Sequence, residues 1–199
     1  MGEQRVRVIA GRWRGRRLEA PPGRSTRPTS DRVREAVFSA VDSRLGGWDD
    51  VRVADLYAGS GALGIEALSR GALHAVFVES DLRAAQCIHR NLMALGVTEN
   101  RATVLSRRVE ATPPATLAPS PVSLLFADPP YRIDAAEVTR IVRLLGEAGT
   151  MRAGTLVVYE HAAGTMPVWP AGFSAEEPRV YGDTAVSFAR YEGEGGRCA

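Results

Sequence analysis

Four consecutive residues, Asp128-Pro129-Pro130-Tyr131, have the chemical groups needed to hold and activate a planar amine. An exocyclic amine on a nucleic-acid base is a poor nucleophile because its lone pair is delocalised into the ring. A carboxylate and a proline carbonyl can accept its two N–H bonds, which draws the nitrogen toward tetrahedral geometry by positioning and electrostatics. The prolines stiffen the segment, and Tyr131 offers a face for stacking. The motif predicts chemistry on a base amine, although taken alone it also fits a rigid turn.

A glycine-rich segment after the strand predicted at 51–57 has the spacing of a nucleotide-binding turn. Gly59, Gly61 and Gly64 allow a tight turn and let a ligand approach the backbone at the start of a helix. Asp55 can meet the positively charged methionine part of S-adenosylmethionine, and Glu79, at the end of the next predicted strand, can accept ribose hydroxyls. The predicted cofactor contacts in this region are Asp55, Tyr57, Ala58, Gly59, Ser60, Gly61, Glu79 and Ser80.

The two motifs together separate the possible cofactors. The glycine spacing alone fits NAD and S-adenosylmethionine equally well, and it also fits a purely structural strand–helix turn. An NAD-dependent oxidoreductase would leave the Asp-Pro-Pro-Tyr motif without a purpose. S-adenosylmethionine supplies the methyl group that an activated amine would attack, so the pair of motifs favours a methyltransferase.

The elements that position these motifs alternate between strand and helix. Strands are expected at 51–57, 75–78, 102–105, 122–127 and 155–159, and helices from residue 29 or 30 to 45, at 61–70, 81–95 and 134–145, with a Pro-rich loop at 112–121. Near-continuous apolar strands between helices predict a mostly parallel sheet covered on both faces. Segments 179–181 and 185–191 flank Gly182-Asp183, a hairpin signal. The sequence therefore predicts an α/β, Rossmann-like methyltransferase fold with a seven-stranded sheet ending in an antiparallel hairpin.

The N-terminal segment is strongly basic. Every one of the 25 basic residues is an arginine, and residues 1–34 hold ten of them against three acids, a formal charge of +7 on a chain of net charge +2. Residues 5–20 read as two short strands with an arginine-rich face. Arginine pairs bidentately with phosphate and stacks on bases, so this face suits a polyanion. The predicted RNA contacts are Arg7, Arg12, Trp13, Arg14, Arg16, Arg17, Arg27, Thr29 and Arg32; for Trp13, a place in a local core is the favoured alternative.

These features divide the chain into a basic N-terminal extension at 1–28, a methyltransferase domain at 29–191 and a disordered tail at 192–199. Cys87 and Cys198 lack metal-ligand spacing, and the three histidines are unclustered, so no metal site is expected. The N-terminus does not resemble a signal peptide, and no apolar run is long enough to span a membrane. We therefore expect a cytoplasmic protein and, in solution, a monomer.

Nearly the whole chain resembles the bacterial 16S rRNA guanine-N2 methyltransferases of the RsmD type. The resemblance includes RVIAGRWRGRRL at 7–18, RPTSDRVREAVF at 27–38, DLYAGSGALGIEALSRGA at 55–72, VES at 78–80 followed by Asp81, the pair Asn91-Leu92, DPPY at 128–131 and the terminal hairpin. The basic segment and RPTSDRVRE are far more specific than the two general methyltransferase motifs.

The resemblance implies one methyl transfer to N2 of a guanine, labelled 966 in the usual small-subunit numbering, in the helix 31 loop of 16S rRNA. Similar enzymes act on assembled or partly assembled small ribosomal subunits. The resemblance also places Arg108 and Val109 beside the cofactor adenine. Family members often have Asp or Asn at the position of Arg108, and arginine has no acceptor for the adenine amine. Either Glu110 or a backbone carbonyl would then take that role, or the adenine would be bound more weakly in this protein.

Two other functions remain open on the sequence. The Asp-Pro-Pro-Tyr chemistry serves any exocyclic amine, so adenine-N6 methylation of DNA or RNA is an alternative substrate assignment. A non-catalytic RNA-binding protein of ribosome assembly would explain the basic segment but not the cofactor motifs.

Overall fold

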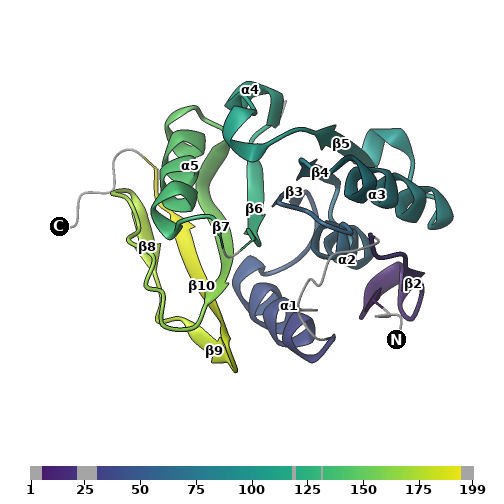
Figure 1. The fold of residues 1–199 in the computed structure, drawn as a ribbon, viewed down its shortest axis with the longest axis horizontal. Coiled ribbons are helices and arrows are strands. Elements are labelled where there is room, and N and C mark those ends of the chain that lie inside the picture. Colours follow the sequence, from purple (N-terminus) through teal and green to yellow (C-terminus); the bar gives the residue numbers. More distant parts are fainter. Residues whose placement is uncertain (1–5, 22–30, 118–119, 131, 194–199) are drawn as a thin grey trace.

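The computed structural model describes residues 6–21, 31–117, 120–130 and 132–193, and its centre is a mixed β-sheet (Figure 1). Five parallel strands form one side of the sheet: β5 (Ala102–Ser106), β4 (His74–Glu79), β3 (Arg52–Leu56), β6 (Val122–Ala127) and β7 (Met151–Ala162), in that order. β10 (Thr184–Tyr191) runs antiparallel to β7 and completes the far side. The strand order reverses between β3 and β6, which is where open α/β sheets bind ligands.

The outermost position of the sheet is shared by two short strands. β9 (Arg179–Tyr181) pairs with the first half of β10, and β8 (Phe173–Ala175) pairs with its second half. The eight strands of this sheet therefore occupy seven positions, and the predicted Rossmann-like methyltransferase fold is confirmed. The hairpin predicted around Gly182 is present, because Tyr181 and Thr184 are paired residues in the β9–β10 register.

Helices cover both faces of the sheet. One face packs against α1 (Asp31–Leu45), α2 (Ala62–Arg70) and α3 (Leu82–Ala94), and the other against α4 (Pro114–Leu117) and α5 (Ala135–Glu147). Alternate residues of β3 explain the division, since Val53 belongs to the first core and Leu56 to the second. No helix in the described ranges has both the length and the apolar character of a membrane span.

Several predicted boundaries differ from the structure. The loop expected at 112–121 contains α4, and three 3-10 turns, η1 (Gly11–Trp13), η2 (Glu99–Arg101) and η3 (Val109–Ala111), lie between the predicted elements. β7 begins at Met151 instead of Thr155, because a register shift against β6 accommodates the extra residues. Thr155 fixes this irregularity by donating to the Val122 carbonyl at 2.7 Å and accepting from the Arg152 amide at 3.1 Å.

The basic segment, as far as it is described, packs on the body of the protein. β1 (Val6–Arg7) and β2 (Arg17–Leu18) form an antiparallel pair joined by η1. We call residues 6–19 the basic head. Its apolar side chains Val8, Trp13 and Leu18 belong to the same core cluster as the buried residues of α1 and α2. The described part of the predicted 1–28 extension therefore shares a core with the body.

Polar contacts from α2 fix the basic head in place. The Glu66 carboxylate, 1 % exposed, accepts from the backbone amides of Ile9 at 2.6 Å and Ala10 at 3.0 Å. The Ser69 hydroxyl accepts from the Trp13 amide at 3.0 Å and donates to the Ala10 carbonyl at 2.6 Å. Buried charged and polar groups need hydrogen-bond partners. The contacts between the head and α2 therefore satisfy the buried polar groups of both segments.

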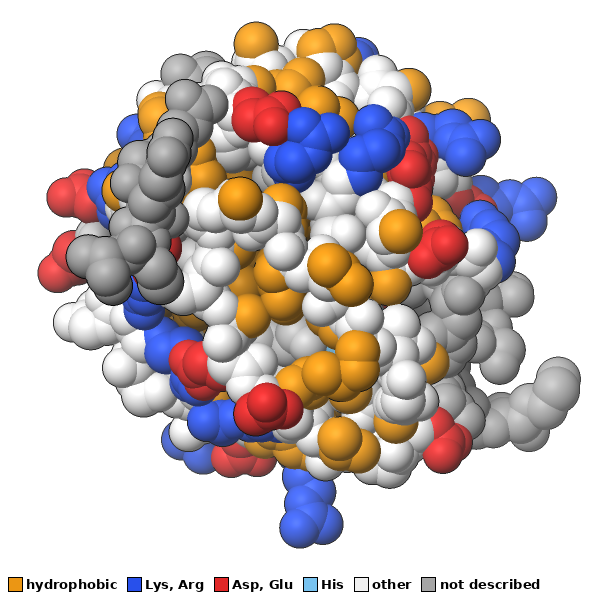
Figure 2. Space-filling model, turned by 90° about the vertical axis from the view of Figure 1, so that its left-hand side faces the viewer, with side chains coloured by type: hydrophobic (Ala, Val, Ile, Leu, Met, Phe, Trp, Pro, Cys, Tyr) orange, Lys and Arg blue, Asp and Glu red, His pale blue; other side chains and the backbone are white. Residues whose placement is uncertain are grey.

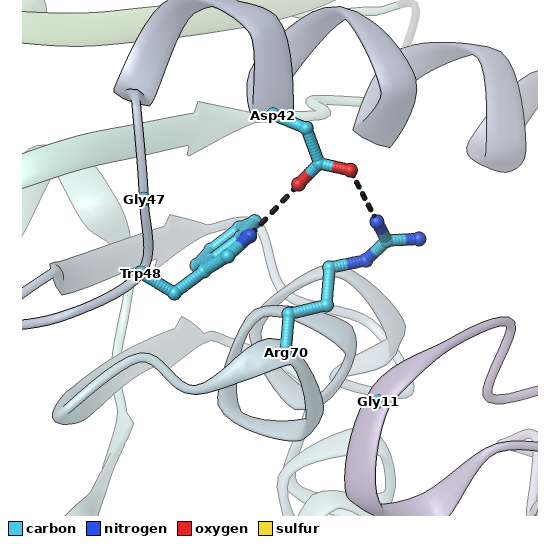
Figure 3. A pocket seen from close by; sticks show the side chains of 5 residues that line it. All are labelled: Gly11, Asp42, Gly47, Trp48 and Arg70. Atoms are coloured by element: carbon cyan, nitrogen blue, oxygen red, sulfur yellow. Dashed lines mark hydrogen bonds and ion pairs between the residues drawn. The ribbon is translucent and has the colours of Figure 1, made fainter.

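A second set of contacts joins the end of α2 to α1, beside the basic head. Asp42 accepts from the Trp48 indole at 2.8 Å and from Arg70 at 2.7 Å, and Gly11 of the head borders the same shallow hollow (Figure 3). Arg70 also donates to Glu66 at 2.8 Å. The acid that holds the head is therefore itself positioned by a partly buried arginine.

Replacing Gly11 with alanine is expected to detach the basic head from α2. A Cβ at Gly11 would lie 2.0 Å from the Ser69 carbonyl oxygen, and the residue has a φ of +81°. Gly15 provides a matched control, because its φ is +80° but a Cβ there meets nothing within 4 Å. Both variants carry the cost of left-handed backbone, about 1–2 kcal/mol, and only Gly11→Ala adds the clash.

Amide hydrogen exchange measures this difference. The amides of residues 8–16 are expected to lose protection in Gly11→Ala and to keep most of it in Gly15→Ala. Equal exchange in the two variants would contradict the role assigned to the close contact with Ser69.

The opposite end of the molecule has a different surface. Figure 2 views the end formed by β8 and α5, where apolar side chains gather across the middle of the face and charged ones lie nearer its margins. Met166, Val168 and Val180, on the 163–172 loop and β9, are exposed.

Candidate active site

The glycine-rich turn crosses the carboxyl end of β3. Tyr57 has a φ of 61°, unusual for a residue with a side chain, and Gly59 and Gly61 follow with φ values of 58° and 78°. Gly61 is the N-cap residue of α2, and its amide donates to the Ala58 carbonyl at 2.7 Å. The backbone therefore turns sharply at the start of a helix, as predicted from the glycines, and leaves little side-chain bulk between the loop and a ligand.

Asp55 lies beneath this turn. Its carboxyl group is 1 % exposed and accepts from the Gly64 amide at 2.9 Å. Burial raises the pKa of Asp55 to about 8, opposed by the hydrogen bond from Gly64 and helped by the negative charge of Glu79. A cation bound above the turn would favour the ionised form of this acid.

Glu79 ends β4 beside the same turn and is 2 % exposed. One carboxylate oxygen accepts from the Gly59 amide and the other from the Asp81 amide, each at 2.8 Å. Glu79 therefore fixes both the glycine-rich turn and the start of α3. Ser80 follows it on the surface.

The turn after β5 contacts Tyr57 of the glycine-rich turn through Glu110. Val109 is buried and Arg108 is exposed, with the Arg108 guanidinium 3.4 Å from the Glu110 carboxylate. The other Glu110 oxygen accepts from the Tyr57 hydroxyl at 3.2 Å, and burial together with the charge of Glu110 raises the pKa of Tyr57. Glu110, not Arg108, is thus the acceptor that the structure places next to the glycine-rich turn.

The Asp-Pro-Pro segment begins where β6 ends. The Asp128 amide donates to the Leu56 carbonyl at 3.4 Å, which connects the segment directly to the end of β3. Pro129 is buried, and the Pro130 carbonyl accepts from the Ile133 amide at 2.9 Å as the chain turns into α5. Tyr131 lies outside the described residues, so its predicted stacking role has no structural counterpart here.

The donor set fits S-adenosylmethionine. Two buried acids, Asp55 and Glu79, lie beneath the glycine-rich turn, and the negative charge of Glu79 helps to raise the pKa of Asp55. A ligand that carries an ammonium and a sulfonium group would favour the ionised form of Asp55, and the hydroxyls of a ribose are donors that a carboxylate such as Glu79 can accept.

Binding of S-adenosylmethionine is expected to strengthen as the pH rises from 6 to 7.5. Asp55 has its pKa raised to about 8, so in the free protein the carboxyl is mostly protonated over this range. A cationic ligand favours the carboxylate, and binding must therefore release a proton, which gives up to about a tenfold gain in affinity per pH unit. Calorimetric titrations at several pH values measure how the affinity for S-adenosylmethionine changes with pH.

The isosteric variant Asp55→Asn serves as the control, because an amide oxygen still accepts from Gly64 but does not titrate. Its affinity is expected to stay flat over the same range. A flat profile for the wild-type protein would contradict the assignment of Asp55.

The predicted RNA contacts divide into three groups. Arg7, Arg12, Arg14, Arg16, Arg17 and Arg32 are exposed. Arg27 and Thr29 lie outside the described residues. Trp13 is 6 % exposed and belongs to the core cluster, which agrees with the favoured alternative of a local core residue. Its side chain packs in the same core cluster as the buried residues of α1 and α2, and its amide donates a hydrogen bond to the Ser69 hydroxyl.

The exposed arginines of the basic head are largely available for a polyanion. The Arg12 guanidinium lies 5.9 Å from the Trp13 ring, and Arg16 donates to the Ala94 carbonyl at 2.9 Å. Arg7 pairs with Asp31 at 2.7 Å while remaining 62 % exposed. Arg14 and Arg17 form no ion pair with another described residue.

Sequence reasoning missed the residues that connect the parts of the site. Glu66 and Ser69 bind the head, and Asn91 contacts both the head and the glycine-rich turn. Each lies on a buried helix face among apolar residues. A polar residue at such a position was a usable signal, because buried polar groups require partners.

Comparisons with known proteins agree with this geometry. The profile of the family described as "Conserved hypothetical protein 95" matches residues 6–190. The ribosomal RNA small subunit methyltransferase D of Escherichia coli K12 is 34 % identical over 197 residues, 98 % of this chain and 94 % of that protein. The putative rRNA methyltransferase YlbH of Bacillus subtilis is 33 % identical over 189 residues, covering 94 % and 100 %.

The solved structure of a putative methyltransferase, yhhF, from Escherichia coli superimposes with a TM-score of 0.79 at 31 % identity. The match covers 96 % of this chain and 99 % of that one. The likeness thus extends over the basic head, the sheet and the terminal hairpin together.

Proposed function

The chain belongs to the conserved hypothetical protein 95 family of RsmD- and YlbH-type, S-adenosylmethionine-dependent rRNA methyltransferases, and from that premise we propose that it methylates N2 of a single guanine in 16S rRNA. The target would be the guanine labelled 966 in the usual small-subunit numbering, within the small ribosomal subunit. The observation that carries this proposal is the hydrogen bond that the Asp128 backbone amide donates to the Leu56 carbonyl. This hydrogen bond joins the Asp-Pro-Pro segment to the end of β3, and it supports an amine and a cofactor bound at adjoining strand ends.

The cofactor contacts proposed for this site follow the fit described above. Asp55 and the turn from Tyr57 to Gly61 would hold the methionine part, and Glu79 with Ser80 the ribose. Val109, Glu110 and the backbone of Arg108 would border the adenine. S-adenosylmethionine supplies an electrophilic methyl group when bound.

The residues of the chain act on the amine. We assign the two N–H acceptors to the Asp128 carboxylate and the Pro129 carbonyl, because the Pro130 carbonyl already accepts from Ile133. Holding both N–H bonds directs the nitrogen lone pair, and the carboxylate stabilises the positive charge that grows on the nitrogen as it accepts the methyl group. The methylated nitrogen then loses one of its protons to solvent, which leaves the neutral product. Pro129 and Pro130 restrict the backbone that carries these acceptors. Tyr131 remains the proposed stacking platform.

The basic head would hold the RNA. Its exposed arginines face solvent on a rigid base provided by Glu66 and Ser69. Phosphate contacts of this kind give affinity that falls steeply with salt, and they orient the substrate without reading its sequence. We propose the contact set Arg7, Arg12, Arg14, Arg16, Arg17, Arg27, Thr29 and Arg32.

Complementation tests the proposed target. The chain would be expressed in an Escherichia coli strain that lacks its ribosomal RNA small subunit methyltransferase D, and the 16S rRNA would be digested and analysed by mass spectrometry. Restored N2-methylguanosine at position 966 is the expected result. New N6-methyladenosine, or methylguanosine at another position, would overturn the substrate assignment. RNA binding without any added methyl group would favour a non-catalytic assembly protein.

A further inference from the structure

One buried side chain on α3 joins the basic head to the cofactor turn. The Asn91 carboxamide, 3 % exposed, donates through Nδ2 to the Ser60 carbonyl at 3.1 Å and to the Glu19 carbonyl at 3.0 Å. Its Oδ1 accepts from the Glu19 amide at 2.8 Å. Ser60 lies within the glycine-rich turn, and Glu19 directly follows β2 of the head. Both polar atoms of this side chain are therefore used in joining two segments far apart in the sequence.

The contacts require an amide at this position. Nδ2 has two hydrogens for two carbonyls, and Oδ1 accepts the Glu19 amide. An aspartate would keep the acceptor and lose both donors, placing a carboxylate oxygen against two carbonyl oxygens. Cys87, one turn earlier on α3, adds a weaker contact from its thiol to the Glu19 carbonyl at 3.1 Å. The end of the head is therefore held by the buried face of α3.

The helix that carries Asn91 is itself fixed at the cofactor end. Asp81 caps α3 by accepting from the amides of Arg83 at 2.8 Å and Ala84 at 3.0 Å. Glu79 accepts from the Asp81 amide and from Gly59 in the turn. Glu79 thus accepts hydrogen bonds from both the start of α3 and the glycine-rich turn. Asn91, further along the helix, adds a second contact between α3 and the turn.

We propose that Asn91 is a positioning residue that holds the cofactor turn and the RNA-binding head at one fixed separation. This inference rests on the proposed function, in which one segment places the methyl donor and the other places the nucleic acid. Methyl transfer depends on the alignment of both, and a misplacement of about 1 Å costs on the order of a hundredfold in rate. Loss of Asn91 should therefore slow transfer itself more than it weakens binding of either partner.

The test compares Asn91→Ala, Asn91→Asp and Leu92→Ala. Leu92 is the next residue of α3 and is also buried, so its truncation removes buried atoms without removing any hydrogen bond to Glu19 or Ser60. Both Asn91 variants are expected to remain folded and to lose about a hundredfold in kcat at saturating cofactor and small subunits, with KM values changed only a few-fold. Leu92→Ala is expected to lower the melting temperature but keep kcat.

Hydrogen exchange gives a readout that needs no substrate. In both Asn91 variants the amides of residues 17–20 and of 58–62 are expected to exchange faster, whereas Leu92→Ala should not affect the two segments together. A folded Asn91→Ala protein whose kcat matches that of Leu92→Ala, or exchange that increases in one segment only, would overturn the proposal. If the wild-type protein methylates no small-subunit RNA while both segments still loosen, the proposed function fails and the structural connection stands.

Discussion

Replacement of Asp128 by alanine is expected to lower kcat by about a thousandfold, the upper range for loss of one preorganised polar group at a reacting centre. Asp128 follows β6, and its backbone amide donates a hydrogen bond to the Leu56 carbonyl of β3. The backbone should therefore stay in place when the carboxylate is removed. Affinity for S-adenosylmethionine should change by less than about twofold, since the cofactor contacts come from other segments. Single-turnover rates and calorimetry measure the two effects separately.

Asp128→Asn is the matched control for this prediction. The amide has nearly the same shape, and its oxygen still accepts one N–H bond. We expect it to retain clearly more activity than the alanine variant and to bind the cofactor equally well. Unimpaired turnover in Asp128→Ala would exclude the carboxylate from the mechanism.

Replacement of Gly64 by alanine is expected to disrupt the cofactor turn and destabilise the protein by about 1–3 kcal/mol, as overpacking of a core does. A Cβ at this position would lie 2.3 Å from Cε1 of the Phe77 ring and 3.1 Å from the Asp55 carboxylate. Because the Gly64 amide also donates to Asp55 at 2.9 Å, displacement of α2 would disturb the acid proposed to meet the cofactor. Chemical unfolding and cofactor titration check both consequences.

A double-mutant cycle with Phe77→Leu isolates the contact. The smaller side chain removes the aromatic atoms closest to the added methyl group, so Gly64→Ala should cost less in the Phe77→Leu background than in the wild type. If the two substitutions change the free energy of unfolding by strictly additive amounts, the Phe77 ring is not what disfavours a larger residue at position 64.

The sheet could be predicted from sequence wherever a strand has an uninterrupted apolar pattern. β6 occupies 122–127, as predicted, because all six residues are buried. β7 begins four residues before its predicted start at 155, since Arg152 and Gly154 interrupt the pattern where the register shifts. β8 has only three residues and depends on pairing with β10. Tertiary contacts create these segments, and local sequence does not report them.

The functional site could likewise be predicted only where the local sequence determines the structure. The glycine spacing and the Asp-Pro-Pro sequence predicted a turn and a strand end that the structure brings together. The connecting residues could not be placed, because their roles depend on which segment packs against their helix. Arg34 illustrates this: a charged residue in the first turn of α1, it is 3 % exposed and donates to Asp31 and the Arg7 carbonyl. The position of the basic head on α1, α2 and α3 supplies that information.

The most direct test of the proposed reaction is methyl transfer in vitro. The protein would be incubated with isotopically labelled S-adenosylmethionine and small ribosomal subunits from cells lacking the corresponding methyltransferase, and the labelled nucleoside would be identified by mass spectrometry. The proposed reaction predicts labelled N2-methylguanosine and no other labelled nucleoside. Labelled N6-methyladenosine, or no label with a protein that binds the cofactor and with subunits that a relative can methylate, would contradict it.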